Sequence, residues 1–350
     1  MMARRCALMF MVLAVWCSGL ASSDNNPKQP AAVGTLQLHG AGATFPAPLY
    51  KKWVEEYQKQ HPDVQLSYKA IGSGEGTKQF MAGVVDFGAS DAAMSDEEMA
   101  AVARGVQLLP TVAGSIVLAY NLDGLRGELK LSRDVYVDIF LGKIPTWDDP
   151  RLKAINPTLR LPHANIAPVV RQDSSGTTYA FTNHLSAMSA KWRDQGPGVG
   201  RVIAWPSHPM IASGNEGVAG RIKNSKGAIG YVEYGFAQRA GLPMAWLENK
   251  AGQFIQPRGD SGMATLQNVD MPENLRIFVP DPDGKDSYPI VTFSWLLVYK
   301  HYDDQHKAAA LKHYIQWCLT EGQAFNETLG YIRLAPQVIE RTMAAADTIR

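Results

Sequence analysis

The fold class is set by LQLHGAGATFPAPLYKKWVEEYQKQHPDVQLSYKAIGSGEGTKQFMAGV (residues 36–84). This stretch begins with the pattern of a short strand that enters a glycine turn, and Leu49, Trp53 and Tyr57 then follow at helical spacing. A second alternating segment predicts another strand, and GSGEG (72–76) predicts a turn that opens a short helix. Because strand, small-residue turn and helix recur in this order, the sequence predicts an α/β fold in layers.

The same order of elements continues along the chain. VVDFGASD (84–91) predicts a strand followed by a loop, and the next segment begins with Ser95 and Glu98 at the spacing of a helix capping box. Residues 106–121 and 288–300 are apolar runs that predict long strands, and the C-terminal part predicts an amphipathic helix.

The N-terminal residues have the pattern of a signal peptide. A positively charged start precedes a short apolar run, and small residues follow. We predict a signal peptide at residues 1–21, with cleavage after Ala21 or Ser23, and a flexible segment at 22–35. An N-terminal membrane anchor is the alternative, but the apolar run is short for a membrane span. The sequence therefore predicts an exported, soluble protein.

Charge and cysteine content narrow the function. The formal charge is +1, and removal of Arg4 and Arg5 with the signal peptide changes it to −1. This balance argues against a broad nucleic-acid or membrane-surface role. Removal of Cys6 and Cys17 leaves only Cys318, so no disulfide is expected within the mature chain. At this length two domains are expected.

Three predicted turns have the composition of anion sites. They are ATF (43–45), GSGEG (72–76) and DSSGTT (173–178). A helix N-terminus offers unpaired backbone N–H groups and the positive end of the helix dipole, and glycine allows close approach of an anion. Hydroxyl donors come from four residues: Thr44, Ser73, Ser175 and Thr177. Ordinary helix capping is the alternative explanation for the same residues.

Two further charged groups accompany these turns. Arg171 ends an apolar strand, where the ligand crevice of an α/β sheet lies, and Asp173 is placed to orient its guanidinium. A surface ion pair of little energetic value is the alternative for these two residues. Asp91 is an acid among groups that suit an anion, and therefore needs an explanation of its own.

Motifs of known enzyme classes are incomplete. The GSGEG turn lacks the G-x-x-x-x-G-K-[ST] spacing of a nucleotide loop, and the DFG at residues 86–88 has no H-R-D partner. Neither H-E-x-x-H nor a cysteine–histidine cluster is found, and no histidine is tied by sequence to Ser175 as a nucleophile. We therefore expect no enzymatic activity, no metal and no cofactor.

Six motifs together resemble one protein family. GAGATFPAPLY, GSGEG, VDFGASDAAM, LGKIPTWDD, RQDSSGTT and GAIGYVEY occur in the order found in the periplasmic phosphate-binding proteins of phosphate ABC transporters. The resemblance runs from about Leu36 to the C-terminal helix. It implies a two-lobed, type II-like binding protein with the ligand in the cleft between the lobes.

The resemblance also implies the lobe boundaries. Residues 36–111 and 290–350 would form lobe 1, and residues 112–289 would form lobe 2. The chain would cross between the lobes twice, near Pro110–Val112 and near Tyr288–Ile290. A monomer in the periplasm, working with transmembrane permease subunits, is the implied context.

Family ligand positions transfer to this chain with matching residue types. Asp173 would orient Arg171, and Phe45 and Gly176 would act through their backbone N–H groups. The implied phosphate ligands are Thr44, Phe45, Ser73, Asp91, Arg171, Ser175, Gly176 and Thr177. Glu75 departs from the small residue expected in the second turn, and its charge would weaken anion binding unless it faces solvent.

The resemblance explains Asp91. Phosphate near neutral pH carries a proton that a buried carboxylate accepts, whereas sulfate carries none and would face the carboxylate oxygen to oxygen. Asp91 would thus exclude sulfate. The alternative is that Asp91 caps the helix that begins near Ser95.

Two other functions are weighed beside phosphate transport. One is an enzyme on the same scaffold, such as a phosphatase that uses the anion pocket. The other is an adhesion or scavenging module in which phosphate binding is incidental; adhesion is suggested by PRGDSG (257–262), a stretch predicted to be a loop.

Overall fold

Two long strands run through the computed structural model, which describes residues 35–206, 208–267 and 269–350. They are β4 (Val106–Tyr120) and β11 (Val291–Tyr299), which pair antiparallel with Val291 opposite Ser115. Every residue of β11 is buried, as is every residue of β4 from Leu108 onward. Strands covered on both faces are apolar throughout instead of alternating, which is why these two segments were predictable as long strands.

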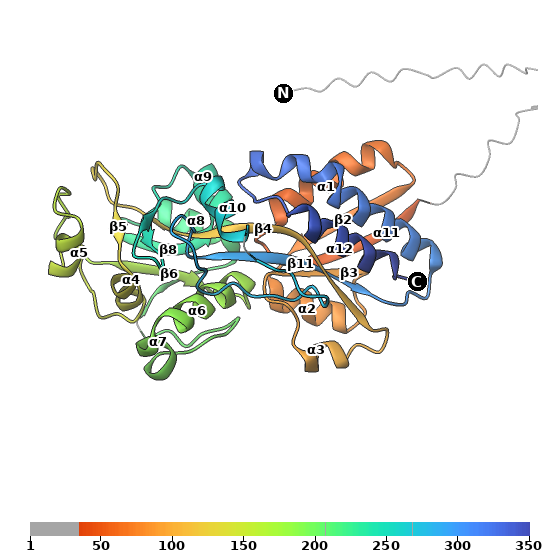
Figure 1. Ribbon diagram of the computed structural model, residues 1–350, viewed down its shortest axis with the longest axis horizontal. Helices are drawn as coiled ribbons and strands as arrows, with labels where there is room; N and C mark the ends of the chain where they lie inside the picture. The colour runs from red at the N-terminus through yellow and green to blue at the C-terminus, as the bar shows by residue number, and fades with distance from the viewer. Residues whose placement is uncertain (1–34, 207, 268) are drawn as a thin grey trace, which may run out of the picture. The chain divides into compact units, whose positions relative to one another are not determined.

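The main sheet has eight strands in the order β2-β1-β3-β11-β4-β8-β6-β7. β4 pairs with β11 over Val106–Ser115 and then with β8 over Ile116–Tyr120, so one strand joins two groups of parallel strands. Figure 1 shows β4 and β11 running between these groups. The remaining strands of this sheet are β1 (Leu36–Gly42), β2 (Val64–Ala70), β3 (Phe87–Ser90), β6 (Ala167–Arg171), β7 (Met210–Ala212) and β8 (Ala228–Glu233).

The directions of the strands create one crevice. β1, β2 and β3 are parallel to one another, and β6, β7 and β8 form a second parallel group. The antiparallel pairings of β11 and β4 make the two groups run in opposite directions, so that their carboxyl ends point toward each other. A ligand of an open α/β sheet binds at the carboxyl ends of its strands. Here the carboxyl ends of six strands face the same space.

A second, smaller sheet has the order β10-β9-β5. This sheet lies beside the parallel group of β6, β7 and β8 (Figure 1). Its three short strands are β5 (Lys130–Leu131), β9 (Trp246–Glu248) and β10 (Phe254–Ile255).

Helices cover the sheet, and their apolar faces form one buried core with it. α1 places Leu49, Trp53 and Tyr57 in that core, as their spacing predicts, and Tyr50 joins them. The helices are α1 (Ala47–Gln60), α2 (Ser73–Met81), α3 (Asp96–Ala100), α4 (Arg133–Phe140), α5 (Pro150–Ile155), α6 (Gly176–Met188), α7 (Ala190–Gln195), α8 (Gly214–Lys223), α9 (Tyr234–Ala240), α10 (Gly259–Leu266), α11 (Gln305–Leu319), η1 (Glu321–Phe325), η2 (Glu327–Leu329) and α12 (Pro336–Asp347).

The predicted helix starts are confirmed, with one loop prediction wrong. The capping box of α3 is complete, because Ser95 accepts from the backbone N–H of Glu98 while the Glu98 side chain accepts from Ser95. PRGDSG is not a loop throughout, since α10 begins at Gly259 within it. The glycines suggested a turn, but Ser261 accepts from the backbone N–H of Arg258 and so stabilises the first turn of a helix.

Two further predictions concern membrane crossing and processing. In the stretches 35–206, 208–267 and 269–350, no helix has the length and apolar character needed to cross a bilayer. The predicted signal peptide, its cleavage site and all but the last residue of the segment 22–35 lie outside the described residues. Cys318 is a buried free thiol.

Candidate functional site

The predicted ligand residues come together at the crevice between the two strand groups. Thr44 and Phe45 follow β1, Ser73 opens α2 after β2, and Asp91 follows β3. From the other group, Arg171 ends β6 and the DSSGTT segment opens α6. Thr44 is half-buried, and the other predicted ligand residues are buried: Phe45, Ser73, Asp91, Arg171, Ser175, Gly176 and Thr177.

Asp91 occupies the centre of this arrangement. Ser294 donates a hydrogen bond of 2.9 Å to Asp91 Oδ1, and the backbone N–H of Asp91 donates to Ser73 Oγ at 3.2 Å. Asp91 is 1% exposed. Burial raises the pKa of its carboxyl to about 7, with the hydrogen bond from Ser294 and the charge of Arg171 acting in the opposite direction. The carboxyl is therefore an acceptor poised to exchange a proton near neutral pH.

Arg171 is held by Asp173, as the sequence predicts. Arg171 Nε donates to Asp173 Oδ1 at 2.7 Å, and Nη2 donates to Asp173 Oδ2, which leaves Nη1 to reach Thr177 Oγ1 at 3.2 Å. Burial disfavours the charge of Asp173, but the hydrogen bonds and charge of Arg171 outweigh it, so the pKa of Asp173 lies below its usual value. The pair fixes a buried cation beside the DSSGTT turn.

The two strand groups touch directly at this point. Gly74 donates its backbone N–H to the carbonyl of Ser174 at 2.9 Å. A β-carbon added to Gly176 would lie 2.4 Å from Ser73 Oγ and 2.8 Å from the backbone nitrogen of Asp91. The turns after β2 and β6 are thus packed to backbone distance, and only glycine fits between them.

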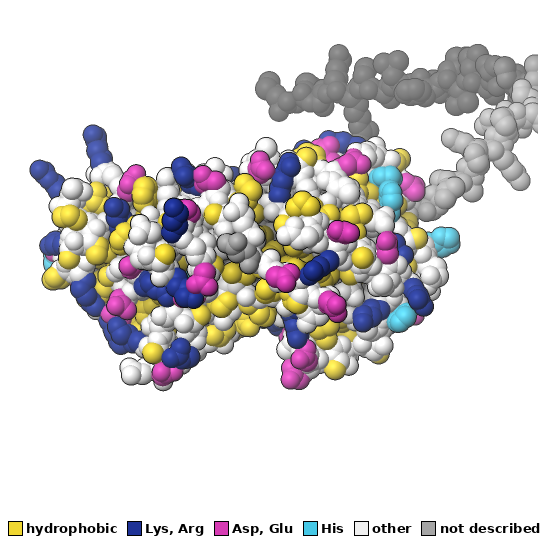
Figure 2. All heavy atoms as spheres, in the orientation of Figure 1, with side chains coloured by type: hydrophobic (Ala, Val, Ile, Leu, Met, Phe, Trp, Pro, Cys, Tyr) yellow, Lys and Arg dark blue, Asp and Glu magenta, His cyan; other side chains and the backbone are white. Residues whose placement is uncertain are grey.

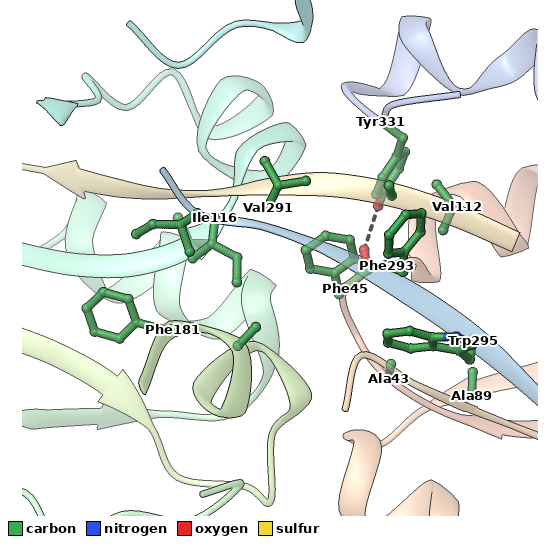
Figure 3. Packing of buried hydrophobic residues seen from close by; sticks show 14 of the residues in the cluster. Ala43, Phe45, Ala89, Val112, Ile116, Phe181, Val291, Phe293, Trp295 and Tyr331 are labelled. Carbon is green, nitrogen blue, oxygen red and sulfur yellow. Dashed lines mark hydrogen bonds between the residues drawn. The ribbon is translucent and has the colours of Figure 1, made fainter. Parts of the chain in front are cut away.

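Phe45 contributes backbone groups more than its ring. Its carbonyl accepts a hydrogen bond of 2.6 Å from the Tyr331 hydroxyl, as drawn in Figure 3. In the part of the chain that the structure describes, neither the backbone N–H of Phe45 nor that of Gly176 has a protein acceptor. Two buried donors therefore remain for a ligand, because orphan N–H groups are rare in protein interiors.

Two residues of the site were missed by sequence reasoning. Asn215, the second residue of α8, donates from Nδ2 to both Thr44 Oγ1 and Thr177 Oγ1 at 3.1 Å. Ser294 lies in the middle of β11 and binds Asp91. The only signal for Asn215 is the short SGNEG segment after β7, where glycine and serine predict a helix start. Ser294 carries no signal, since it stands in an apolar strand.

Two arginines hold the segment that follows Asp91. Arg201 binds Glu98 with both Nη atoms, at 2.5 and 3.1 Å, and also donates to the carbonyl of Ala92. Arg276 donates to the carbonyl of Met94 at 3.0 Å. These contacts join the loop after β3 to residues far along the chain and keep Asp91 in its buried position.

A cleft of about 980 Å³ leads to the site from the side of α1 and α8. Thr44 and Asp173 line this cleft together with three charged residues, Lys51, Glu216 and Arg239. Acidic and basic side chains are interspersed over the face shown in Figure 2, in keeping with the balanced charge. Glu75 is half-buried, and one of its carboxylate oxygens accepts a hydrogen bond of 2.9 Å from the Gln79 side chain within α2.

The helix caps and the acidic, histidine and cysteine side chains bear on the alternative roles of individual residues. The N-cap of α3 is Ser95, so the idea that Asp91 caps this helix is wrong. The Ser175 hydroxyl accepts from the backbone N–H of Thr178 and caps α6. Among residues 35–206, 208–267 and 269–350 no group of three acidic, histidine or cysteine side chains is arranged to hold a metal.

Sequence comparison identifies relatives over most of the chain. Residues 27–321 match the PBP superfamily domain. Phosphate-binding protein PstS of Pasteurella multocida is 39% identical over 310 residues, covering 88% of this chain and 89% of that protein. Phosphate-binding protein PstS of Methanocaldococcus jannaschii is 36% identical over 370 residues, covering 99% and 94%. These relatives are named as binding proteins and not as enzymes, which agrees with the expectation from the sequence.

Solved structures show the same fold. A high affinity periplasmic phosphate-binding protein, PfluDING, bound with phosphate, superposes with a TM-score of 0.73 at 21% identity, over 88% of this chain and 93% of that one. A phosphate binding protein from Stenotrophomonas maltophilia gives 0.73 at 20% identity, over 88% and 93%. The predicted fold class, a two-lobed α/β binding protein, is thereby confirmed.

Proposed function

We propose that this chain, which belongs to the PstS family of phosphate-binding proteins, binds inorganic phosphate outside the cytoplasm and delivers it to the permease of a phosphate ABC transporter. The observation that carries the proposal is the composition of the site. Among the residues that the structure describes, the crevice gathers the buried carboxyl of Asp91, the buried guanidinium of Arg171, several hydroxyls and the backbone N–H groups of Phe45 and Gly176, which have no protein acceptor. Donors in excess around a single acceptor suit an anion that still carries one proton.

The residues proposed to contact phosphate would supply positive charge and directed hydrogen bonds. Arg171 would neutralise the anion with a guanidinium that Asp173 holds in place. The start of α6 would add the helix dipole and the N–H of Gly176. Residues proposed to contact phosphate are Thr44, Phe45, Ser73, Asp91, Arg171, Ser175, Gly176 and Thr177.

Asp91 is proposed to accept the proton of the phosphate and thereby to exclude sulfate. In its charged form a buried carboxylate repels a fully deprotonated anion and leaves two acceptors facing each other. A site that depends on one hydrogen-bonding group of its ligand rejects an analogue without it by up to about 10⁴- to 10⁵-fold. Because the pKa of Asp91 is about 7, sulfate binding is expected to strengthen as the pH falls below this value and the carboxyl becomes a donor.

Release of phosphate requires the two lobes to separate. We place lobe 1 at residues 36–111 and 290–350 and lobe 2 at residues 112–289, with crossings near Pro110–Val112 and Tyr288–Ile290. Contacts such as that between Gly74 and Ser174 would then belong to the closed state only. A ligand that favours this state shifts the population toward it, and the closed protein would present its surface to the permease.

We also propose that the protein is exported and acts as a monomer. Residues 1–21 are proposed to be removed as a signal peptide, so that the mature protein acts in the periplasm. The mass and N-terminal sequence of the protein recovered from the periplasm would check this step, and an intact N-terminus would contradict it.

Titration calorimetry on the ligand-stripped mature protein tests the function. We expect phosphate to bind and sulfate to give no heat at pH 8, and Asp91→Asn to lose most of this discrimination. Asp123→Asn, which changes an exposed aspartate paired with Lys226, is the matched control and should bind as the wild type does. A folded wild-type protein without phosphate binding would overturn the proposal. Unchanged discrimination in Asp91→Asn would refute only the role of Asp91.

A further inference from the structure

Asn215 lies at the point where the two strand groups meet, and it is fully buried. Its amide nitrogen reaches Thr44 Oγ1, from the first group, and Thr177 Oγ1, from the second, both at 3.1 Å. Its backbone N–H also donates to Thr44 Oγ1 at 3.1 Å. Gly214, in a left-handed conformation with φ of 68°, directs the chain from β7 into this position.

The amide can have only one orientation. Asn215 Oδ1 accepts a hydrogen bond of 3.0 Å from the backbone N–H of Glu233. Rotating the amide by half a turn would set its NH₂ group against that N–H and leave a buried donor without an acceptor. The NH₂ group therefore faces the two threonine hydroxyls.

Both hydroxyl oxygens have their acceptor capacity filled by these contacts. A hydroxyl oxygen has two lone pairs and one hydrogen. Thr44 Oγ1 accepts from the backbone and the side chain of Asn215, and Thr177 Oγ1 accepts from Asn215 and from Arg171. Each hydroxyl must consequently direct its own hydrogen away from Asn215.

We propose that Asn215 is a positioning residue that fixes the hydroxyls of Thr44 and Thr177 as donors to the bound anion. This inference rests on the proposed phosphate binding and extends it to a residue without a direct ligand contact. With both hydroxyls fixed as donors, Asp91 is the acceptor that remains for the proton of the ligand. Asn215, Arg171 and Thr177 all belong to the proposed lobe 2, so Thr177 keeps its direction in the open state, whereas Thr44, in the proposed lobe 1, meets Asn215 only when the site is closed.

Charged groups surround Asn215 on each side. Glu233 borders its side-chain oxygen, Arg171 shares Thr177 with it, and Asp173 accepts from the neighbouring Gly214 N–H at 2.9 Å. Asp91 stands across the site. A carboxylate introduced at this position would repel three acids and would turn both hydroxyls toward itself and away from the ligand.

Calorimetry of two variants at Asn215 tests this inference. Asn215→Ala frees both hydroxyls to rotate, and we expect phosphate to bind about 10- to 100-fold more weakly. Asn215→Asp keeps the shape but reverses two hydrogen bonds, and we expect a loss of more than about 100-fold at pH 8. The loss for Asn215→Asp relative to wild type should shrink toward pH 5, as the introduced carboxyl takes up a proton and donates again, whereas that for Asn215→Ala should stay constant.

A double-mutant cycle separates positioning from a general loss of structure. If Asn215 acts through Thr44, the change Asn215→Ala weakens binding by a smaller factor in a Thr44→Val background than in the wild type. Asn224, an exposed asparagine at the end of α8, gives the matched controls Asn224→Ala and Asn224→Asp, which should bind normally.

The outcomes distinguish this inference from the function on which it rests. Wild-type protein that fails to bind phosphate overturns the proposed function and, with it, the role of Asn215. Two results would overturn the role of Asn215 alone when the wild type binds phosphate normally. One is that Asn215→Ala weakens binding by the same factor in the Thr44→Val background as in the wild type. The other is that the loss of affinity in Asn215→Asp does not change with pH. If Asn215→Ala does not fold, the pH dependence of phosphate binding by Asn215→Asp tests the role of Asn215 by itself.

Discussion

Substitution of Gly176 by alanine should separate closure of the lobes from folding of the chain. Gly176 is the first residue of α6, and an added β-carbon would lie 2.4 Å from Ser73 Oγ and 2.8 Å from both the nitrogen and the β-carbon of Asp91. Real β-carbons essentially never come within 3.0 Å of such atoms, and backbone atoms cannot rotate away. Both contacts belong to the proposed lobe 1, whereas Gly176 belongs to the proposed lobe 2.

The expected magnitude follows from this overlap. Overpacking of this kind costs about 1–3 kcal/mol, which corresponds to phosphate binding about 5- to 150-fold weaker. Alanine retains the backbone N–H proposed to contact phosphate, so no ligand contact is removed. The ligand-free protein should unfold at the same denaturant concentration as the wild type or a higher one, because alanine suits a helix better than glycine and the open lobes relieve the overlap.

Calorimetry with phosphate and urea unfolding without it measure the two effects. Gly220→Ala is the matched control, since Gly220 lies inside α8 and an added β-carbon there meets no atom within 4 Å. This control should gain about 0.5–1 kcal/mol of stability and bind phosphate normally. Wild-type affinity in Gly176→Ala would refute the contact between the two turns in the bound state. A loss of folding stability as large as the loss of binding would refute the opening of the lobes at this point.

Two further predictions concern the contacts around the site and the pH dependence of folding. Glu98→Gln removes the partner of Arg201, and because both side chains are partly exposed, at 27% and 19%, phosphate affinity should fall only about 2- to 5-fold, with a smaller effect at high salt in the same titration. An unchanged or strongly reduced affinity would contradict this estimate. His184 is buried between Tyr136 and the carbonyl of Pro280, and burial lowers its pKa to about 4. The unfolded chain then binds the proton more readily, so stability is complete above pH 6.5 and up to about 3 kcal/mol is lost as the pH falls toward 4. Asp91, whose pKa is raised to about 7, contributes in the opposite direction over the same range, so urea unfolding of the wild type and of His184→Gln is compared at several pH values. The difference in unfolding free energy between the two proteins should change by this amount, and a difference that stays constant with pH would exclude His184 as its source.

Much of the fold could be predicted because local patterns agree with it. The spacing of Leu49, Trp53 and Tyr57 identifies the buried face of α1, and the apolar runs identify β4 and β11 as strands buried on both faces. The turns that end β1, β2 and β6 predict helix starts at which an anion can be held. These features depend on neighbouring residues only, so a single sequence contains them.

The rest depends on pairings between distant segments. Ser294 meets Asp91 because β11 pairs with β3, and no local pattern marks that serine. Asn215 reaches Thr44 across 171 positions of sequence. The start of α10 at Gly259 was not predicted, because the glycines around it indicate a turn, although Ser261 stabilises a helix there. Sequence reasoning thus identified the residues proposed to contact the ligand, whereas Asn215 and Ser294, which bind those residues, were found only in the structure.

The position of β11 in the sheet has a consequence for the order in which the chain can fold. β3 and β4 are close in sequence, yet β11, at residues 291–299, lies between them and pairs with both. Until that strand has been synthesised, β3 and β4 have no partner on the sides that face each other, and their edges stay uncovered. Such long-range pairing is slow to form. With the export proposed above, this arrangement would delay folding until the chain has crossed the membrane, because the centre of the sheet is completed only when nearly all of its residues are available.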